Sequence, residues 1–142
     1  MMKVRFKKEV STAPLPSYAK PGDAGLDLVA VSIKENTTFQ VTYGLGISCE
    51  IPSGYVGLIY PRSSIRKYEL VLSNSVGVVD SGYRGELQAT FNKTNGLLSM
   101  MYRIGERVCQ MVIVPYPMIE VEEAADLEPS ERGEGGFGST GR

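Results

Sequence analysis

The chain has 142 residues, with 15 basic against 16 acidic side chains and a formal net charge of -1. This length suits one domain, and the near-neutral charge gives no overall field to attract nucleic acid or a membrane surface. The only two cysteines, Cys49 and Cys109, are too few for a disulfide framework and indicate a reduced, cytoplasmic setting. No apolar run approaches the ~18 residues of a membrane span. Histidine is absent, so carboxylates must supply any acid or base chemistry.

Short apolar or alternating runs recur along the chain between Gly, Pro, Asn and Ser residues. This spacing is typical of an all-β sandwich or barrel, and the best helical candidate is one short turn near residues 63–68. The predicted strands cover residues 4–6, 25–31, 38–41, 45–51, 55–60, 70–72, 76–79, 86–91 and 107–114. Loops or arms are predicted for residues 11–22, for residues 92–97 and after residue 117. The sequence therefore predicts one barrel-like domain over residues 1–117 and an arm over residues 118–142.

Asp27 is a lone carboxylate in an otherwise apolar predicted strand. Because a buried lone charge is costly, this side chain needs a partner. It either caps backbone amides at the strand end or holds hydrated magnesium, an ion that takes one or two carboxylates plus phosphates. Farther along, Arg62, Ser63 and Ser64 place a fork of donors and two hydroxyls at a bend. They suit phosphate oxygens, and a surface arginine beside a polar turn is the alternative.

The densest motif spans residues 74–86. Gly77 lies among apolar residues, where a glycine indicates a bulge or a close approach of the backbone to a ligand. Asp80 ends the apolar run, and an ionised carboxylate there is able to accept a proton from water. Tyr83 is placed to pack against a ring; the alternative is a hairpin turn at Asp80 with Tyr83 covering the core. Gln110, an amide among apolar residues, must also find partners, for which neighbouring backbone groups are the common choice.

The arm carries seven acidic residues and one basic residue between positions 118 and 135, a composition typical of disorder. It ends in glycines punctuated by a cation, an aromatic ring and two hydroxyls: Arg132, Phe137, Ser139 and Thr140. Glycine lets backbone amides approach a phosphate closely, so this end is either a disordered tail or an anion-binding lid. It is not a P-loop, because no lysine precedes the two hydroxyl residues.

Taken together and in order, these five segments resemble the five motifs of the trimeric dUTP pyrophosphatase (dUTPase) family. The linking residues 15–22 and 51–57 agree as well. The resemblance implies a distorted jelly-roll β-barrel with a flexible glycine-rich C-terminal arm, in a homotrimer whose active sites are shared between subunits. The implied activity is Mg²⁺-assisted hydrolysis of dUTP to dUMP and pyrophosphate, which keeps uracil out of DNA and supplies dUMP for thymidylate synthesis. The implied location is the cytoplasm, or the host-cell cytoplasm for a phage or viral protein.

The resemblance also implies a role for each candidate residue. Asp80 matches the catalytic base that activates a water for attack on the α-phosphorus, and Asp27 matches the carboxylate that contacts magnesium through water. Arg62, Ser63 and Ser64 match the phosphate contacts, with Ser64 standing where the family usually has glycine.

The other matches are substrate-binding residues. Asn74, Gly77, Val78 and Val79 belong to the hairpin that receives uracil, Tyr83 packs on deoxyribose and excludes a 2′-hydroxyl, and Gln110 lies at the nucleotide site. Arg132 reaches the terminal phosphate, Phe137 stacks over uracil, and Gly138, Ser139 and Thr140 cradle phosphate. Arg84, Glu86 and Arg107 lie inside the motifs and are predicted to form structural ion pairs.

Two other functional classes are compatible with the sequence. A dCTP deaminase shares the architecture but acts on cytosine, and the run at residues 78–83 together with the arm favours dUTP hydrolysis. A non-catalytic barrel, either structural or a dUTPase-derived binding protein, predicts that catalytic or arm residues are missing. Asp27, Asp80, Tyr83 and Phe137 are all present.

Overall fold

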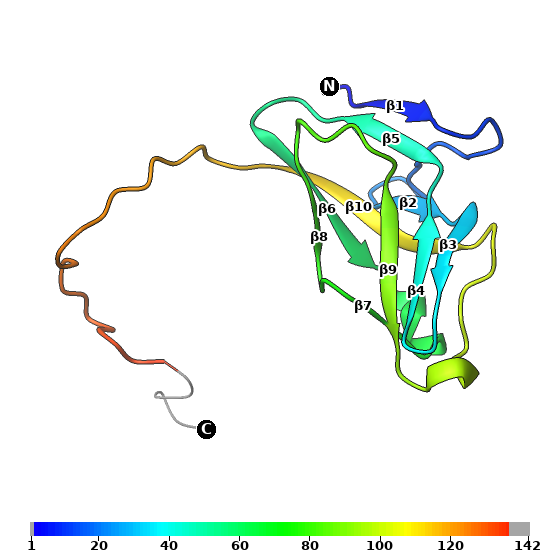
Figure 1. Cartoon of the computed structure of the whole chain (residues 1–142). Coiled ribbons are helices and arrows are strands. Elements are labelled where there is room, and N and C mark those ends of the chain that lie inside the picture. Colours follow the sequence, from blue (N-terminus) through cyan, green and yellow to red (C-terminus); the bar gives the residue numbers. More distant parts are fainter. Residues whose placement is uncertain (1, 137–142) are drawn as a thin grey trace.

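The computed structural model describes residues 2–136, which contain ten β-strands, two short 3-10 helices and no α-helix (Figure 1). The strands are β1 (Arg5–Lys8), β2 (Leu26–Val29), β3 (Ser32–Asn36), β4 (Gln40–Gly44), β5 (Ile47–Glu50), β6 (Tyr55–Pro61), β7 (Leu70–Leu72), β8 (Gly77–Val79), β9 (Gln88–Lys93) and β10 (Arg107–Pro115). The helices are η1 (Ser63–Lys67), where the helical turn was expected, and η2 (Gly96–Leu98). The predicted all-β fold is confirmed. No helix in this part of the chain is long and apolar enough to cross a membrane.

Two four-stranded antiparallel sheets and one two-stranded sheet make up the body (Figure 1). Their strand orders are β2-β10-β6-β8, β3-β4-β9-β7 and β1-β5. In the first sheet β10 pairs with β2 on one side and β6 on the other, so that Gln110 lies opposite both Asp27 and Tyr60. Strand β8 pairs only with β6 and forms one edge of this sheet. The same sheet therefore presents candidate site residues at two different places, at its β8 edge and where β2, β10 and the end of β6 meet.

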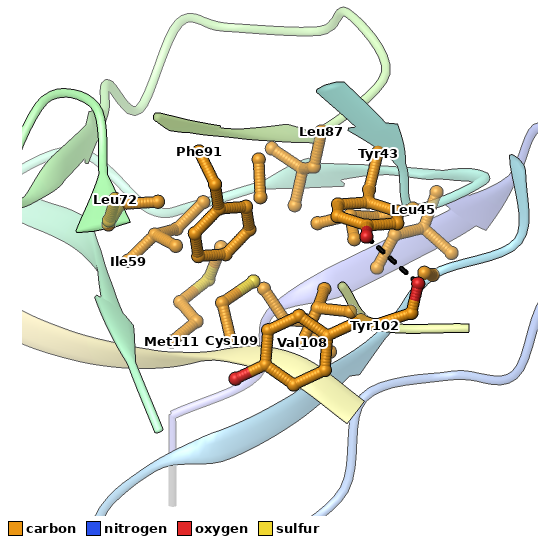
Figure 2. Packing of buried hydrophobic residues seen from close by; sticks show 14 of the residues in the cluster. Tyr43, Leu45, Ile59, Leu72, Leu87, Phe91, Tyr102, Val108, Cys109 and Met111 are labelled. Carbon is orange, nitrogen blue, oxygen red and sulfur yellow. Dashed lines mark hydrogen bonds between the residues drawn. The ribbon is translucent and has the colours of Figure 1, made fainter. Parts of the chain in front are cut away.

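The core lies between the two larger sheets and is centred on aromatic rings (Figure 2). Tyr43 packs edge-on against Phe91 and Tyr102, with ring centroids 5.9 and 6.3 Å apart. Because a buried hydroxyl needs a partner, the Tyr43 hydroxyl donates a hydrogen bond of 2.9 Å to the backbone oxygen of Tyr102. This bond ties the segment between η2 and β10 to the centre of the barrel.

Strand β3 is missing from the sequence-based prediction, for a clear physical reason. Four of its five residues are exposed, so the segment lacks the alternation of buried and exposed side chains that marks a half-buried strand. It forms by pairing with β4, and residues 37–39 make the turn between them, although strand was expected from residue 38. Strand β9 likewise begins two residues later than predicted and continues to Lys93, through the start of an expected loop.

The described part of the arm contains no helix or strand, and Figure 1 shows it running away from the body. The Tyr116 amide donates to the Gly54 oxygen at 3.0 Å, just beyond the end of β10. Residues 115–134 are exposed. An arm boundary at residue 118 stays a prediction.

Stability should fall at high pH, because burial raises the pKa of four core groups: Tyr43, Cys49, Tyr102 and Cys109. The pKa of Tyr43 rises from 10.0 to about 12, and that of the Cys109 thiol from 9.0 to about 12. Both groups therefore lose their protons more easily in the unfolded chain. Their stabilising contribution is complete below pH 9 and is lost as the pH rises towards 12. Urea unfolding at a series of pH values should show a free energy of unfolding that declines across this window.

Two variants test the source of this decline. Tyr43→Phe removes one titrating group and leaves the Tyr102 carbonyl without its donor, so it should be about 1–3 kcal/mol less stable at neutral pH. Its stability should nevertheless fall less steeply with pH, and the same shallower slope is expected for Cys109→Ala. An unchanged slope in both variants would contradict the assignment to these groups.

Candidate active site

The first cavity, of about 310 Å³, lies beside β8 and the loop that follows it. It brings together six of the candidate residues: Asn74, Gly77, Val78, Val79, Asp80 and Tyr83. Its other lining residues, which the sequence analysis did not assign to a binding site, are Ile59, Glu86, Leu87 and Gln88. Leu87 and Gln88 directly follow the third motif, residues 74–86, and this position in the sequence could have indicated that they line the same site. The cavity has the size of a small-ligand site.

A tight turn before β8 shapes one wall of this cavity. Ser75 has a φ of 60°, and its amide donates to the Leu72 oxygen at 3.0 Å. A Cβ added at Gly77 would lie 3.1 Å from the Cβ of Ile59 on β6. The close packing of β8 on β6 therefore favours a glycine here, and a close approach of this backbone to a ligand stays a prediction.

The loop after β8 places Asp80 and Tyr83 at the cavity. The Tyr83 amide donates to the Asp80 backbone oxygen at 3.1 Å, which closes a turn and leaves the Asp80 side chain exposed. Tyr83 is 46% exposed, so the alternative in which it covers the core is wrong. Arg84 donates to the carbonyls of Ser81 and Tyr83 at 2.7 and 2.9 Å. These backbone contacts stand in place of the ion pair predicted for Arg84.

A second cavity, of about 430 Å³, lies where β2, β10 and the end of β6 meet. It brings together Asp27, Arg62, Ser63 and Gln110. No lining residue is common to the two cavities. Ser64 contributes instead to a neighbouring hollow of about 340 Å³, together with Ser63, Arg66 and Lys67. Within one chain the candidate residues therefore form two groups.

Both oxygens of Asp27 are bound by arginines. Nε of Arg62 donates to Oδ1 at 2.6 Å, and Nη1 of Arg107 donates to Oδ2 at 2.9 Å. The Asp27 side chain is only 10% exposed, so the two guanidinium groups supply the partners that a nearly buried carboxylate requires. Nη1 of Arg62 also donates to the Ser64 hydroxyl at 3.3 Å. The ion pair predicted for Arg107 is confirmed, and Asp27 is its partner.

The amide of Gln110 is paired with backbone. Its Nε2 donates to the Pro61 oxygen at 3.0 Å, and its Oε1 occupies the space that a side chain at Gly25 would need. Sequence alone had left open whether Gln110 pairs with backbone or with a ligand. The Gln110 amide therefore holds the backbone directly before Arg62, where the segment that carries the Ser63 and Ser64 hydroxyls begins.

The described residues do not form a resident metal site. Residues 2–136 contain no group of three or more carboxylate or cysteine side chains arranged to hold an ion. The carboxylate predicted to contact magnesium, Asp27, is already neutralised by Arg62 and Arg107. Its contact with magnesium through water stays a prediction.

Arg132 is the candidate arm residue that the structure describes, and it lines neither cavity. Nε of Arg132 donates to the Gly135 oxygen at 2.8 Å within the arm. Phe137, Gly138, Ser139 and Thr140 lie outside the described residues. Glu86 forms its predicted ion pair, with Lys34 at 2.7 Å.

Comparison with known proteins decides the family. The dUTPase family model matches residues 11–141, nearly the whole chain. The chain belongs to the dUTPase family. A deoxyuridine 5'-triphosphate nucleotidohydrolase of Alcanivorax borkumensis is 44% identical over 137 residues, covering 91% of this chain and 89% of the relative. The Hahella chejuensis enzyme of the same name is 39% identical, covering 99% and 95%.

The fold agrees with solved dUTPases. The dUTPase of Staphylococcus bacteriophage 80alpha, solved with dUPNHPP, superimposes with a TM-score of 0.86 at 27% identity, and both chains are covered completely. The resemblance inferred from the five motifs and the expected jelly-roll fold are both confirmed.

The pairing at Asp27 predicts a stability effect. Asp27→Asn removes the negative charge that both Arg62 and Arg107 contact, so the two guanidinium groups would lose their shared ion-pair partner. We expect a loss of about 1–3 kcal/mol, less than for a fully buried pair because Arg107 is half exposed. Urea unfolding measures this loss. The control is Asp23→Asn in the same cavity, whose carboxylate accepts only the exposed Lys20 amide; equal stability of the two variants would contradict the account.

Proposed function

We propose that the chain hydrolyses dUTP to dUMP and pyrophosphate. The observation that carries the proposal is the first cavity, where an edge strand, an aromatic ring and an exposed carboxylate face one space. The edge strand suits the base of a nucleotide, the aromatic ring suits its sugar, and the carboxylate suits the water that attacks it. The names of the curated relatives and the fit of the family model support the same reaction.

The uracil end is proposed to bind along β8. As an edge strand, β8 leaves backbone N–H and C=O groups unpaired on the side away from β6. Such groups imitate the pairing partner of a base, with Asn74 at the turn and residues 77–79 along the strand. Cytosine would meet mismatched donors and acceptors, and the methyl group of thymine would not fit in a tight hairpin.

The sugar is proposed to lie against Tyr83. The Tyr83 hydroxyl donates to the Glu86 backbone oxygen at 3.2 Å, and a side chain at Gly85 would collide with this hydroxyl. The ring is therefore held across the cavity by its own loop. A 2′-hydroxyl on the sugar would meet the ring face, so Tyr83 would favour deoxyribose over ribose.

Asp80 is proposed as the general base. Its exposed carboxylate takes a proton from a water, the oxygen of that water bonds to the α-phosphorus, and the bond from this phosphorus to the bridging oxygen breaks. Pyrophosphate leaves, and no covalent intermediate with the protein is required. Most of the barrier reduction would come from positioning and charge neutralisation, as is general for phosphoryl transfer.

The triphosphate is proposed to lie in the second cavity. Arg62 is oriented there by Asp27 and by the backbone bond from Gln110, with the hydroxyls of Ser63 and Ser64 beside it. Magnesium would reach this cavity as part of the substrate, bound to the triphosphate.

One nucleotide reaches both cavities if they belong to different subunits. We propose a homotrimer in which the nucleoside cavity of one chain faces the phosphate cavity of its neighbour. The separation of the two cavities within one chain supports this arrangement. An arm would then close the site, with Arg132 at the terminal phosphate, Phe137 over uracil, and Gly138, Ser139 and Thr140 around the phosphates.

The proposed reaction has a simple cellular purpose. It would remove dUTP before uracil enters DNA, and it would supply dUMP for thymidylate synthesis. The proposed location is the cytoplasm, or the host-cell cytoplasm if the protein is encoded by a phage or virus.

Substrate specificity is the first test of the proposal. Purified protein should release pyrophosphate from dUTP with magnesium, and release little from dCTP, dTTP or UTP. Asp80→Asn should lower kcat about 10²–10⁴-fold without changing the oligomeric state, because only the general base is removed. Ammonia release from dCTP would favour a deaminase, and near-normal turnover by the variant would refute the role of Asp80.

Subunit mixing tests the shared site. Asp80→Asn and Arg62→Met should each be nearly inactive. Co-refolding equal amounts should restore activity, because about one quarter of the sites then combine an intact Asp80 from one chain with an intact Arg62 from its neighbour. Mixing without refolding is the control. A co-refolded mixture as inactive as its components would show that each chain builds its own site.

A further inference from the structure

Glu86 links the nucleoside cavity to the second four-stranded sheet. The residue lines the cavity, while its carboxylate is bound elsewhere. Its Oε2 lies 2.7 Å from Nζ of Lys34 on β3, and its Oε1 accepts the Gly46 amide at 3.0 Å. The side chain of Glu86 is 21% exposed, so this carboxylate depends on its partners for charge compensation.

The pair is packed over a glycine of β4. A Cβ at Gly44 would collide with the Lys34 stem and the Ser32 hydroxyl, and would lie 2.8 Å from Oε1 of Glu86. Gly44 pairs with Ser32 on β3 and with Gln88 on β9. Because Gly44 has no side chain, the stem of Lys34 and the carboxylate of Glu86 can occupy the space over β4. The two side chains therefore have less room to move than those of an ordinary surface ion pair.

The anchoring of Glu86 is transmitted to Tyr83 through the backbone. The Tyr83 hydroxyl donates to the backbone oxygen of Glu86. The next residue, Leu87, forms hydrogen bonds through both its amide and its backbone oxygen. Its amide donates to the Ile47 oxygen at 2.8 Å, and its oxygen accepts the Leu45 amide at 3.0 Å. Glu86 is therefore the point at which an exposed loop joins the rigid sheet.

We propose that Lys34 is a positioning residue that acts through Glu86 to hold Tyr83 against the sugar, and so sets the discrimination between deoxyribonucleotides and ribonucleotides. This inference rests on the proposed function, because it assigns the Tyr83 side of the cavity to the sugar. Without the lysine, only the Gly46 amide would hold the carboxylate, and the Glu86 carbonyl that accepts from Tyr83 would be less firmly placed. A small displacement of the ring makes room for a 2′-hydroxyl.

The test compares three variants with the wild type in steady-state hydrolysis of dUTP and UTP. Lys34→Met removes the charge and keeps an apolar stem of similar length over Gly44; Lys34→Arg keeps the charge. Lys93→Met is the matched control, since Lys93 lies on the same sheet and donates to Asn36 and Thr37 without lining either cavity.

Lys34→Met should raise KM for dUTP about fivefold with little change in kcat, because a binding contact is misplaced and the general base is untouched. The ratio of kcat/KM for UTP to that for dUTP should rise about tenfold. Lys34→Arg should restore both values, and Lys93→Met should match the wild type.

The outcomes separate this inference from the proposed function. A wild type that does not hydrolyse dUTP overturns both. A wild type that hydrolyses dUTP selectively, with an unchanged UTP ratio in Lys34→Met, overturns the positioning role alone. Failure of Lys34→Met to fold, measured by thermal unfolding, also overturns it, because the lysine would then support the whole barrel. A selectivity change of the same size in Lys93→Met would do so too.

Discussion

The pairing of β10 with both β2 and β6 is the constraint on which the site depends. Its register sets Gln110 opposite Asp27 and Tyr60, and this places a carboxylate, an amide and the chain entering Arg62 side by side. A shift of one residue would turn these side chains to the other face of the sheet. The bulge between Arg107 and Cys109 lies in the same strand, beside the arginine that completes the pairing of Asp27. The strand register therefore also determines which charged side chains meet in the site.

The two cavities divide the chemistry between different parts of this sheet. The cavity that we propose binds phosphates is built from polar side chains that restrain one another: Asp27 holds Arg62, and the amide of Gln110 holds the backbone before it. The nucleoside cavity uses an edge strand and a loop instead. That loop is fixed by Leu87 and by the contact of Glu86 with Lys34. Contacts within the chain therefore hold the residues of each cavity, and such preorganisation would reduce the entropy lost on binding.

The sequence predicted the features that follow from local pattern. Alternating runs located most strands, and the carboxylate and ring at Asp80 and Tyr83 stood in a recognisable motif. Strand β3 was missed because most of its residues are exposed. The pairing of Asp27 with Arg107, 80 residues away, depends on register and cannot be read from spacing alone. The direction of the Gln110 amide was also beyond the sequence, since it depends on the space left by Gly25.

The central claim is that one nucleotide bridges the nucleoside cavity of one subunit and the phosphate cavity of another. A crystal structure of this protein with a non-hydrolysable dUTP analogue tests it most directly. The account predicts uracil on the backbone of β8, the Asp80 carboxylate facing a water in line with the α-phosphorus, and phosphates on Arg62 of a neighbouring subunit. Phosphates bound to Arg62 of the same chain, or a nucleotide lying outside the β8 cavity, would contradict it.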